Sequence, residues 1–114
     1  MSTSNWNELP AAIAAYLTAH PARDVAAALE AFAPDAVVTD EGRTHRGRQE
    51  IQTWLGSGAS EYTYTTEFRG ATRIDATRTD VVQHLEGDFP GGVADLHFRF
   101  TLAGGLISRL VIEP

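Results

Sequence analysis

Two side chains in the first part of the sequence could together carry out proton transfer. Asp40 ends the short apolar run AVVTD, and Tyr16 lies in the apolar repeat of the N-terminal segment. A carboxylate near apolar side chains can take a proton from a carbon next to a carbonyl group, and a tyrosine hydroxyl can stabilise the resulting enolate. The alternative is that Tyr16 is a core aromatic residue and Asp40 an ordinary strand-end residue, because aspartate is common before turns. The sequence leaves both interpretations open.

The elements that must position this pair begin with helices. Apolar residues at helical spacing run over residues 9–20 and put Tyr16 on the buried side of a first helix. A second helical repeat covers residues 25–32, and the proline that follows should end it. A third helix is expected over residues 48–55, with Gly56 as its C-terminal cap.

The hydrophobic period changes to two after the second helix, which predicts strands. Val38 and Asp40 share one face of a first strand that starts at Asp35, and His45 falls in the loop that follows. Short turns separate four further strands, expected at about 62–75, 79–87, 94–102 and 106–112. This order predicts one α+β domain over residues 1–114, with three helices packed on one face of a curved antiparallel sheet.

The inward positions of these elements predict an apolar pocket that a flat ligand could fill. Its expected lining residues are Tyr16, Phe32, Val38, Trp54, Tyr64, Phe68, Phe98 and Phe100, with Gln83 as a hydrogen-bonding candidate. The outward positions of the strands include Thr63, Thr65, His84, His97 and Arg99. No helix is left to cover that polar face, so we expect it to form a homodimer interface.

Two histidines lie near the helices and the expected pocket. His45 could reach the mouth of the pocket from its loop, although a solvated loop histidine is the more common outcome. His20 is expected to cap the C-terminal end of the first helix.

The amino-acid composition limits the classes of molecule that the protein is expected to bind. The net charge is −6, and the nine basic residues are scattered arginines, which argues against nucleic acid and anionic membranes as partners. No cysteine is present, and no metal-ligand spacing or phosphate-binding loop occurs in its proper context, so we expect neither a metal nor a cofactor. No apolar window is long enough to span a membrane, and a soluble, cytoplasmic protein is expected.

The order of elements resembles the nuclear transport factor 2-like superfamily, and within it the SnoaL-like and ketosteroid isomerase branches. The stretches AFAPDAVVTD, RGRQEIQTWL, HFRF and AGGLISRL carry the resemblance, which covers nearly the whole chain. It implies a cystatin-like α+β roll, in which a cone of bent sheet is closed by helices around one deep pocket, commonly in a dimer. The superfamily hosts isomerases, cyclases, hydratases, epoxide hydrolases and catalytically silent subunits, so the fold alone settles little about function.

The resemblance implies roles for Tyr16 and Asp40, whose separation equals that between the hydrogen-bonding tyrosine and the aspartate base of ketosteroid isomerases. Those enzymes also place a second, neutral carboxylic acid before an HFRF-like strand. Leu96 stands at that position here, and Asp95, one residue away, would reach the pocket only through a bulge. A true steroid isomerase is therefore not expected. The remaining hypotheses are an isomerase, cyclase or hydratase acting on an apolar carbonyl compound, and a noncatalytic ligand-binding or dimerisation module.

Overall fold

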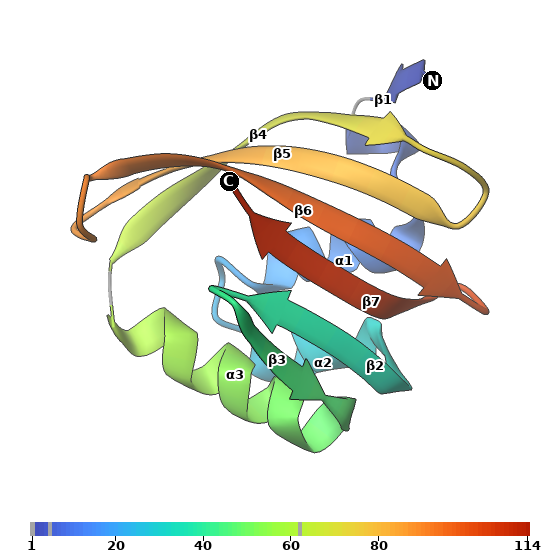
Figure 1. Cartoon of the computed structure of the whole chain (residues 1–114), viewed down its shortest axis with the longest axis horizontal. Coiled ribbons are helices and arrows are strands. Elements are labelled where there is room, and N and C mark those ends of the chain that lie inside the picture. The colour runs from blue at the N-terminus through green and yellow to red at the C-terminus, as the bar shows by residue number, and fades with distance from the viewer. Residues whose placement is uncertain (1, 5, 62) are drawn as a thin grey trace.

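The computed structural model describes residues 2–4, 6–61 and 63–114, and the side chains of residues 6–56 and 63–114 (Figure 1). It has the expected α+β fold, with helices gathered in the first half of the chain and hairpins in the second. The elements in chain order are β1 (Ser2–Ser4), the short 3-10 helix η1 (Trp6–Glu8), α1 (Ala11–Ala19), α2 (Val25–Glu30), β2 (Phe32–Asp40), β3 (Arg43–Arg46), α3 (Gly47–Glu61), β4 (Tyr64–Arg73), β5 (Arg78–Gly87), β6 (Val93–Ala103) and β7 (Leu106–Glu113).

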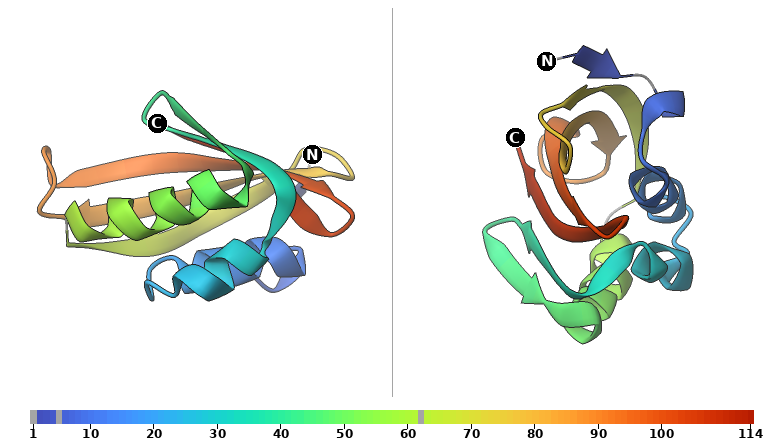
Figure 2. Two further views of the ribbon diagram at one scale, coloured as in Figure 1. Left: turned by 90° about the horizontal axis from the view of Figure 1, so that it is seen from below. Right: turned by 90° about the vertical axis from the view of Figure 1, so that its right-hand side faces the viewer.

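The described strands form one sheet in the order β1-β4-β5-β6-β7-β2-β3. Every neighbouring pair is antiparallel except β2 and β7, which run parallel. The sheet is therefore mixed, where the sequence predicted a purely antiparallel one. Figure 2 shows that the sheet is strongly bent, with α1 and α2 packed on one side of it and α3 alongside β2 and β3.

The second helix is shorter, and the strand after it longer, than the sequence pattern predicted. Phe32, expected in the helix, begins β2 and pairs with Ile107 of β7. The strand tolerates Pro34 because its ladder to β7 is interrupted between Phe32 and Val37. Arg48 fixes this junction, since its Nε and Nη2 atoms donate hydrogen bonds of 3.2 and 2.7 Å to the carbonyl oxygen of Phe32.

Two further boundaries differ from the prediction. Residues 43–46 form β3 rather than a loop, and the hairpin turn contains Glu41 and Gly42 with φ angles of 53° and 75°. Two positive φ angles suit the tight hairpin turn that matches strand twist. Helix α3 does not end at Gly56, which lacks a positive φ and lies inside the helix. A glycine there costs about 1 kcal/mol relative to alanine, which tertiary packing can offset.

A β-bulge in β4 reverses the faces of its last residues. The pairing with β5 shifts by one residue between Phe68 and Gly70. The inward face follows the prediction up to Phe68. Strict alternation would continue it to Thr72, but beyond the bulge Ala71 is the buried residue. Tyr62, at the start of the strand expected over residues 62–75, lies outside the described residues.

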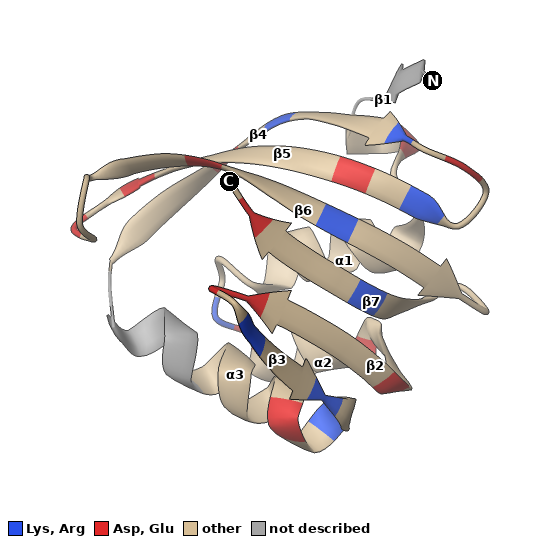
Figure 3. Cartoon of the chain, in the orientation of Figure 1, with Lys and Arg blue, Asp and Glu red and all other residues tan. Residues whose placement is uncertain are grey.

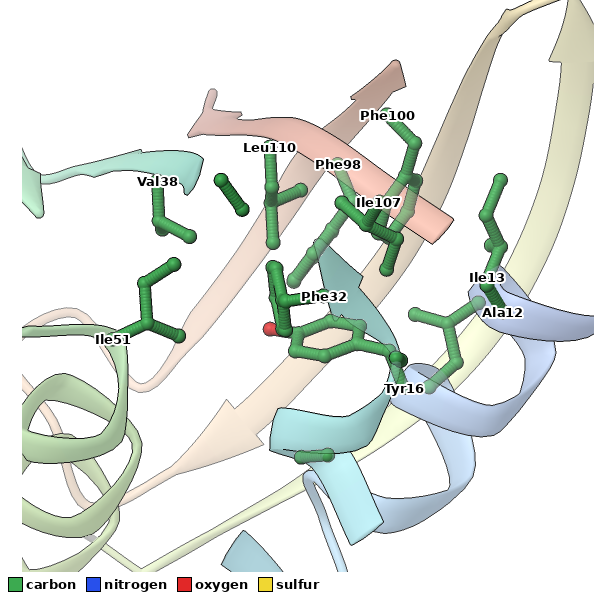
Figure 4. Packing of buried hydrophobic residues seen from close by; sticks show 14 of the residues in the cluster. Ala12, Ile13, Tyr16, Phe32, Val38, Ile51, Phe98, Phe100, Ile107 and Leu110 are labelled. Atoms are coloured by element: carbon green, nitrogen blue, oxygen red, sulfur yellow. The ribbon is translucent and has the colours of Figure 1, made fainter. Parts of the chain in front are cut away.

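The hydrophobic core lies between the helices and the inner face of the sheet. Tyr16, Phe32 and Phe100 are the largest fully buried side chains. The Tyr16 ring meets the other two edge to face, with ring centroids 5.6 and 5.7 Å away, and Figure 4 shows it pointing into the cluster from α1. These contacts hold α1 against β2 and β6, and so fix the position of the helix that carries Tyr16.

Two glycine substitutions test the packing of β5 and α3. A Cβ atom at Gly87 would overlap the carbonyl oxygen of Thr63 and the backbone of Tyr64, so Gly87→Ala should lower the free energy of unfolding by about 1–3 kcal/mol. A Cβ atom at Gly56 would meet nothing within 4 Å, and Gly56→Ala should raise stability by about 0.5–1 kcal/mol. Urea denaturation measures both. A Gly87→Ala protein as stable as the wild type would contradict the close approach of β5 to Thr63 and Tyr64.

Candidate functional site

A cavity of about 700 Å³ opens at the end of the fold where β2 and β7 finish. Much of its wall is apolar and comes from α3 and the inner face of the sheet. The apolar lining includes Trp54, Leu85, Phe89, Leu96, Phe98 and Ile112, and the polar lining includes His20, Asp40, Glu41, Arg43 and His45. A space of this size is in the range that small-molecule ligands occupy.

A second, much smaller space of about 20 Å³ adjoins the cavity. It has room for about one water molecule. Tyr16, Thr66 and Gln83 line it, and it shares four wall residues with the larger cavity, namely His20, Tyr64, Leu85 and Phe98. The two spaces are therefore neighbours, and Tyr16 borders only the smaller one.

Asp40 lies on the wall of the larger cavity, at the end of β2. Its carboxylate turns inward with Val38, which is fully buried on the same face of the strand. The indole Nε1 of Trp54, which projects from α3, donates a hydrogen bond of 3.1 Å to Oδ2 of Asp40. No donor in the described part of the chain occupies Oδ1, and no buried polar side-chain atom there lacks a partner, so Oδ1 is open to the cavity.

Tyr16 reaches the site through His20. The Tyr16 hydroxyl and Nδ1 of His20, one helical turn later, are joined by a hydrogen bond of 2.8 Å. Burial raises the pKa of Tyr16 well above its usual value, and the negative charge of Asp40 adds to the effect. Burial lowers the pKa of His20, while the charge of Asp40 partly opposes that shift. All three groups thus share one electrostatic environment.

Trp54 lies between two histidines. Its ring centroid is 5.7 Å from that of His20 and 5.9 Å from that of His45, which stacks on it from β3 at an interplanar angle of 29°. From the sequence, His20 was expected only to cap the helix, a position that it does occupy, and its place in the site was missed. Its separation of four residues from Tyr16 was the signal that could have found it.

The predicted lining residues divide into two groups. Three of them, Trp54, Tyr64 and Phe98, line the larger cavity, and Tyr16 and Gln83 line the smaller space. The others belong to packed clusters rather than to these walls: Phe32, Val38 and Phe100 in the core, and Phe68 against Trp6 at a centroid distance of 5.4 Å. Because the sheet is bent, the inward side chains farther from the cavity, such as Phe32 and Phe100, contact the helices. These side chains fill the space between the sheet and the helices.

Asp95 does not take the place of the second carboxylic acid of the steroid isomerases. Leu96 lines the cavity, and β5 and β6 pair through this region without a bulge. Asp95 therefore stays on the outer face, where it bonds His84 at 2.6 Å. His97 bonds Asp80 on the same face, at 2.9 Å. Figure 3 shows further charged positions along β5, β6 and β7.

The described residues contain neither a metal-binding cluster nor a helix suited to a membrane. No cluster of three or more histidine, aspartate or glutamate side chains is arranged to hold a metal ion there. None of the described helices combines the length and apolar character needed to cross a membrane.

Comparisons with known proteins agree with this architecture. Residues 13–110 match the model of a family described as a SnoaL-like domain. The structure is similar to that of a candidate polyketide cyclase from Sinorhizobium meliloti, with 34% sequence identity, coverage of 96% of this chain and 100% of that chain, and a TM-score of 0.90. No curated protein sequence matches the chain significantly.

Two more distant structures share the fold. One is a Δ5-3-ketosteroid isomerase from Mycobacterium sp., with 19% identity, coverage of 91% of this chain and 90% of that chain, and a TM-score of 0.74. The other is a Mycobacterium tuberculosis protein in complex with estradiol-17β-hemisuccinate, with 15% identity, coverage of 90% of each chain and a TM-score of 0.75. At these identities the likeness extends to the fold alone.

The titration of His20 tests the electrostatics of the site. We expect its pKa to lie below the ~6.5 of a free histidine because of burial. Asp40→Asn should lower the pKa further, since it removes a negative charge that favours the imidazolium. His84 is the control: hydrogen bonds to Asp95 and Glu86 raise its pKa, and Asp40→Asn should leave it unchanged. NMR of the ring protons follows both residues, and a His20 midpoint at or above the free value would contradict the buried placement.

Proposed function

The chain belongs to the SnoaL-like domain family of the nuclear transport factor 2-like superfamily, and from this premise we propose that it binds an apolar, carbonyl-bearing small molecule and transfers a proton on it. Asp40 is the general acid/base. The observation that carries the proposal is the carboxylate itself, since Oδ2 is held by Trp54 and Oδ1 faces a largely apolar cavity of about 700 Å³. A carboxylate oxygen in this position could reach the carbon next to the carbonyl of a ligand bound in the cavity.

The proposed step begins with proton abstraction. The Asp40 carboxylate takes a proton from the carbon next to the carbonyl, the C–H electron pair becomes the C=C bond of an enolate, and the carbonyl π pair moves onto oxygen. In a β,γ-unsaturated ketone the enolate is conjugated with the C=C bond, and return of the proton from Asp40 to the γ carbon shifts that double bond and gives the conjugated isomer. Alternatively, the enolate carbon forms a C–C bond to a second carbonyl carbon, whose oxygen takes the proton, which gives a ring. The similarity to a candidate polyketide cyclase supports substrates that carry more than one carbonyl group.

A noncatalytic ligand-binding module is the second candidate function. It is favoured by Leu96, which lines the cavity where steroid isomerases have a hydrogen-bond donor to the enolate oxygen. Without that donor, the cavity retains its apolar walls and its capacity for a ligand, but it has one fewer group to stabilise developing charge. The two functions differ in whether a bound ketone exchanges its protons.

We also propose a homodimer formed through the outer face of β4–β7. No described helix covers this face (Figure 1). It carries hydrogen-bonded and ion pairs that leave much of their side-chain surface exposed, among them the pair of Arg99 and Glu113 at 2.9 Å. Side chains that are already held in such pairs lose less conformational entropy when an interface forms than mobile charged side chains do.

Hydrogen exchange on a model ketone tests the role of Asp40. β-Tetralone is flat, apolar and acidic next to its carbonyl, so the protein should accelerate uptake of deuterium at that carbon from heavy water. Asp40→Asn should lower the acceleration by about 100-fold, the usual effect of losing a positioned general base. Proton NMR measures the exchange.

The matched control is Asp35→Asn, the same substitution at an exposed position of the same strand. It should leave exchange unchanged. Equal exchange in the wild type and in Asp40→Asn would contradict the catalytic role of Asp40. Binding of β-tetralone without any acceleration would favour the ligand-binding module.

Association of the protein tests the interface. Light scattering at micromolar concentration should give the mass of a dimer. Thr65→Arg, at an exposed position of the outer face on β4, should weaken association because it forces a bulky charge between the sheets. Gln52→Arg, at an exposed position of α3, should not. A monomer at every concentration tested would overturn the proposed interface.

A further inference from the structure

The hydroxyl of Tyr16 is not available to a ligand in the larger cavity. The side chain is fully buried, and the hydroxyl is already bonded to Nδ1 of His20 at 2.8 Å. Phe32 and Phe100 meet the ring edge to face, so the hydroxyl cannot turn toward that cavity without opening a close-packed core. A ligand there meets His20, which lines the cavity, rather than Tyr16.

The hydrogen bond to Tyr16 determines which nitrogen of His20 carries the proton. A buried hydroxyl must donate its single proton, because an unmade buried hydrogen bond costs free energy. Among the described residues, the acceptor within reach of the Tyr16 hydroxyl is Nδ1 of His20. With Nδ1 as the acceptor, the proton of a neutral imidazole lies on Nε2. Burial lowers the pKa of His20 and raises that of Tyr16, which favours this pair of protonation states.

Nε2 of His20 is exposed to the site. It has no hydrogen-bond partner within the described part of the chain, where every buried polar side-chain atom has one, so Nε2 is accessible. Trp54 packs against the imidazole at 5.7 Å and donates to Asp40 at 3.1 Å. The indole ring of Trp54 thus contacts both the imidazole of His20 and the carboxylate of Asp40, and restricts the movement of one relative to the other.

We propose that Nε2–H of His20 donates the hydrogen bond that stabilises the substrate oxyanion, and that Tyr16 is a positioning residue that holds His20 in the tautomer required. This inference rests on the proposed function, because the oxyanion forms when Asp40 takes the proton from carbon. No proton is transferred to or from His20 in the step. The oxygen gains the carbonyl π pair and accepts a hydrogen bond from a donor that is already oriented.

Tyr64 offers the competing donor. Its side chain lines both spaces, and burial raises its pKa, so its hydroxyl keeps its proton. No hydrogen bond among the described residues fixes that hydroxyl, which can rotate about its C–O bond. The imidazole of His20, in contrast, is fixed by Tyr16 and by Trp54. A preorganised donor stabilises developing charge more than a mobile one, which makes His20 the stronger candidate and Tyr64→Phe the matched control.

The tautomer of His20 can be measured without a substrate. Two-dimensional NMR that correlates the ring nitrogens with the ring protons, near neutral pH, should show a protonated Nε2 and an unprotonated Nδ1 in the wild type. Tyr16→Phe should shift both nitrogens toward a mixture of tautomers, while Tyr64→Phe should leave them unchanged. A protonated Nδ1 in the wild type would overturn the inference, and this measurement does not depend on any variant that fails to fold.

A ligand with an enolate-like oxygen tests contact with Nε2. β-Naphthol resembles the enol of β-tetralone and carries one hydroxyl oxygen on a flat apolar frame. His20→Phe keeps a ring against Trp54 but removes the donor, and should weaken β-naphthol binding by at least about tenfold. Tyr64→Phe should weaken it much less. If the two variants rank in the opposite order, or if His20→Phe binds as well as the wild type, His20 is not the donor.

The outcomes separate this inference from the proposed function. Exchange that depends on Asp40, with β-naphthol binding independent of His20, would overturn the inference and leave the role of Asp40 standing. Exchange that is absent, with the tautomer and the His20-dependent binding as expected, would overturn the proposed function and leave His20 as a ligand-binding donor. A wild-type protein that binds neither compound would overturn both.

Discussion

The parallel pairing of β2 with β7 is the constraint on which the site depends. It sets Val38 beside Leu110 and Asp40 beside Ile112. The Asp40 carboxylate therefore lies at the border between the hydrophobic core and the cavity. Helix α3 follows directly from the β2–β3 hairpin and packs on β2, which places Trp54 within hydrogen-bond distance of Asp40. A change of register in this one pair would move the carboxylate to the opposite face of the sheet or to another depth.

The site brings the Asp40 carboxylate together with hydrogen-bonding groups that are neutral. Burial keeps Tyr16 and Tyr64 protonated and favours a neutral His20, and the charge of Asp40 acts on all three. Leu96 stands where the steroid isomerases have a second acid, so this part of the wall is apolar, while Glu41 and Glu113 also line the cavity. Under the proposed function, Asp40 accepts the proton, and a neutral group donates a hydrogen bond to the oxygen on which negative charge develops.

The alternation of apolar residues predicted much of this fold and part of the site. It placed Tyr16 inside α1, turned Asp40 inward with Val38, and assigned Gln83 and Phe98 to the inner face. Alternation distinguishes the two faces of a strand but contains no information on depth, so it could not separate core residues such as Phe32 from the cavity wall. The short exposed strand β3 and the bulge in β4 leave no apolar pattern, because both are determined by pairing with neighbouring strands.

The β2–β3 hairpin has a consequence for how the cavity could change its selectivity. In the sheet of the described residues β3 is an edge strand that pairs only with β2, and its turn, at Glu41 and Gly42, projects beyond the core. Glu41, Arg43 and His45 all line the mouth of the cavity from this hairpin. Insertions or replacements there would reshape the entrance without disturbing the buried cluster, because loop tips tolerate changes that close-packed interiors do not. The residues that keep the protein folded are thus separate from those that, under the proposed function, would select its ligands, and the two sets could diversify independently.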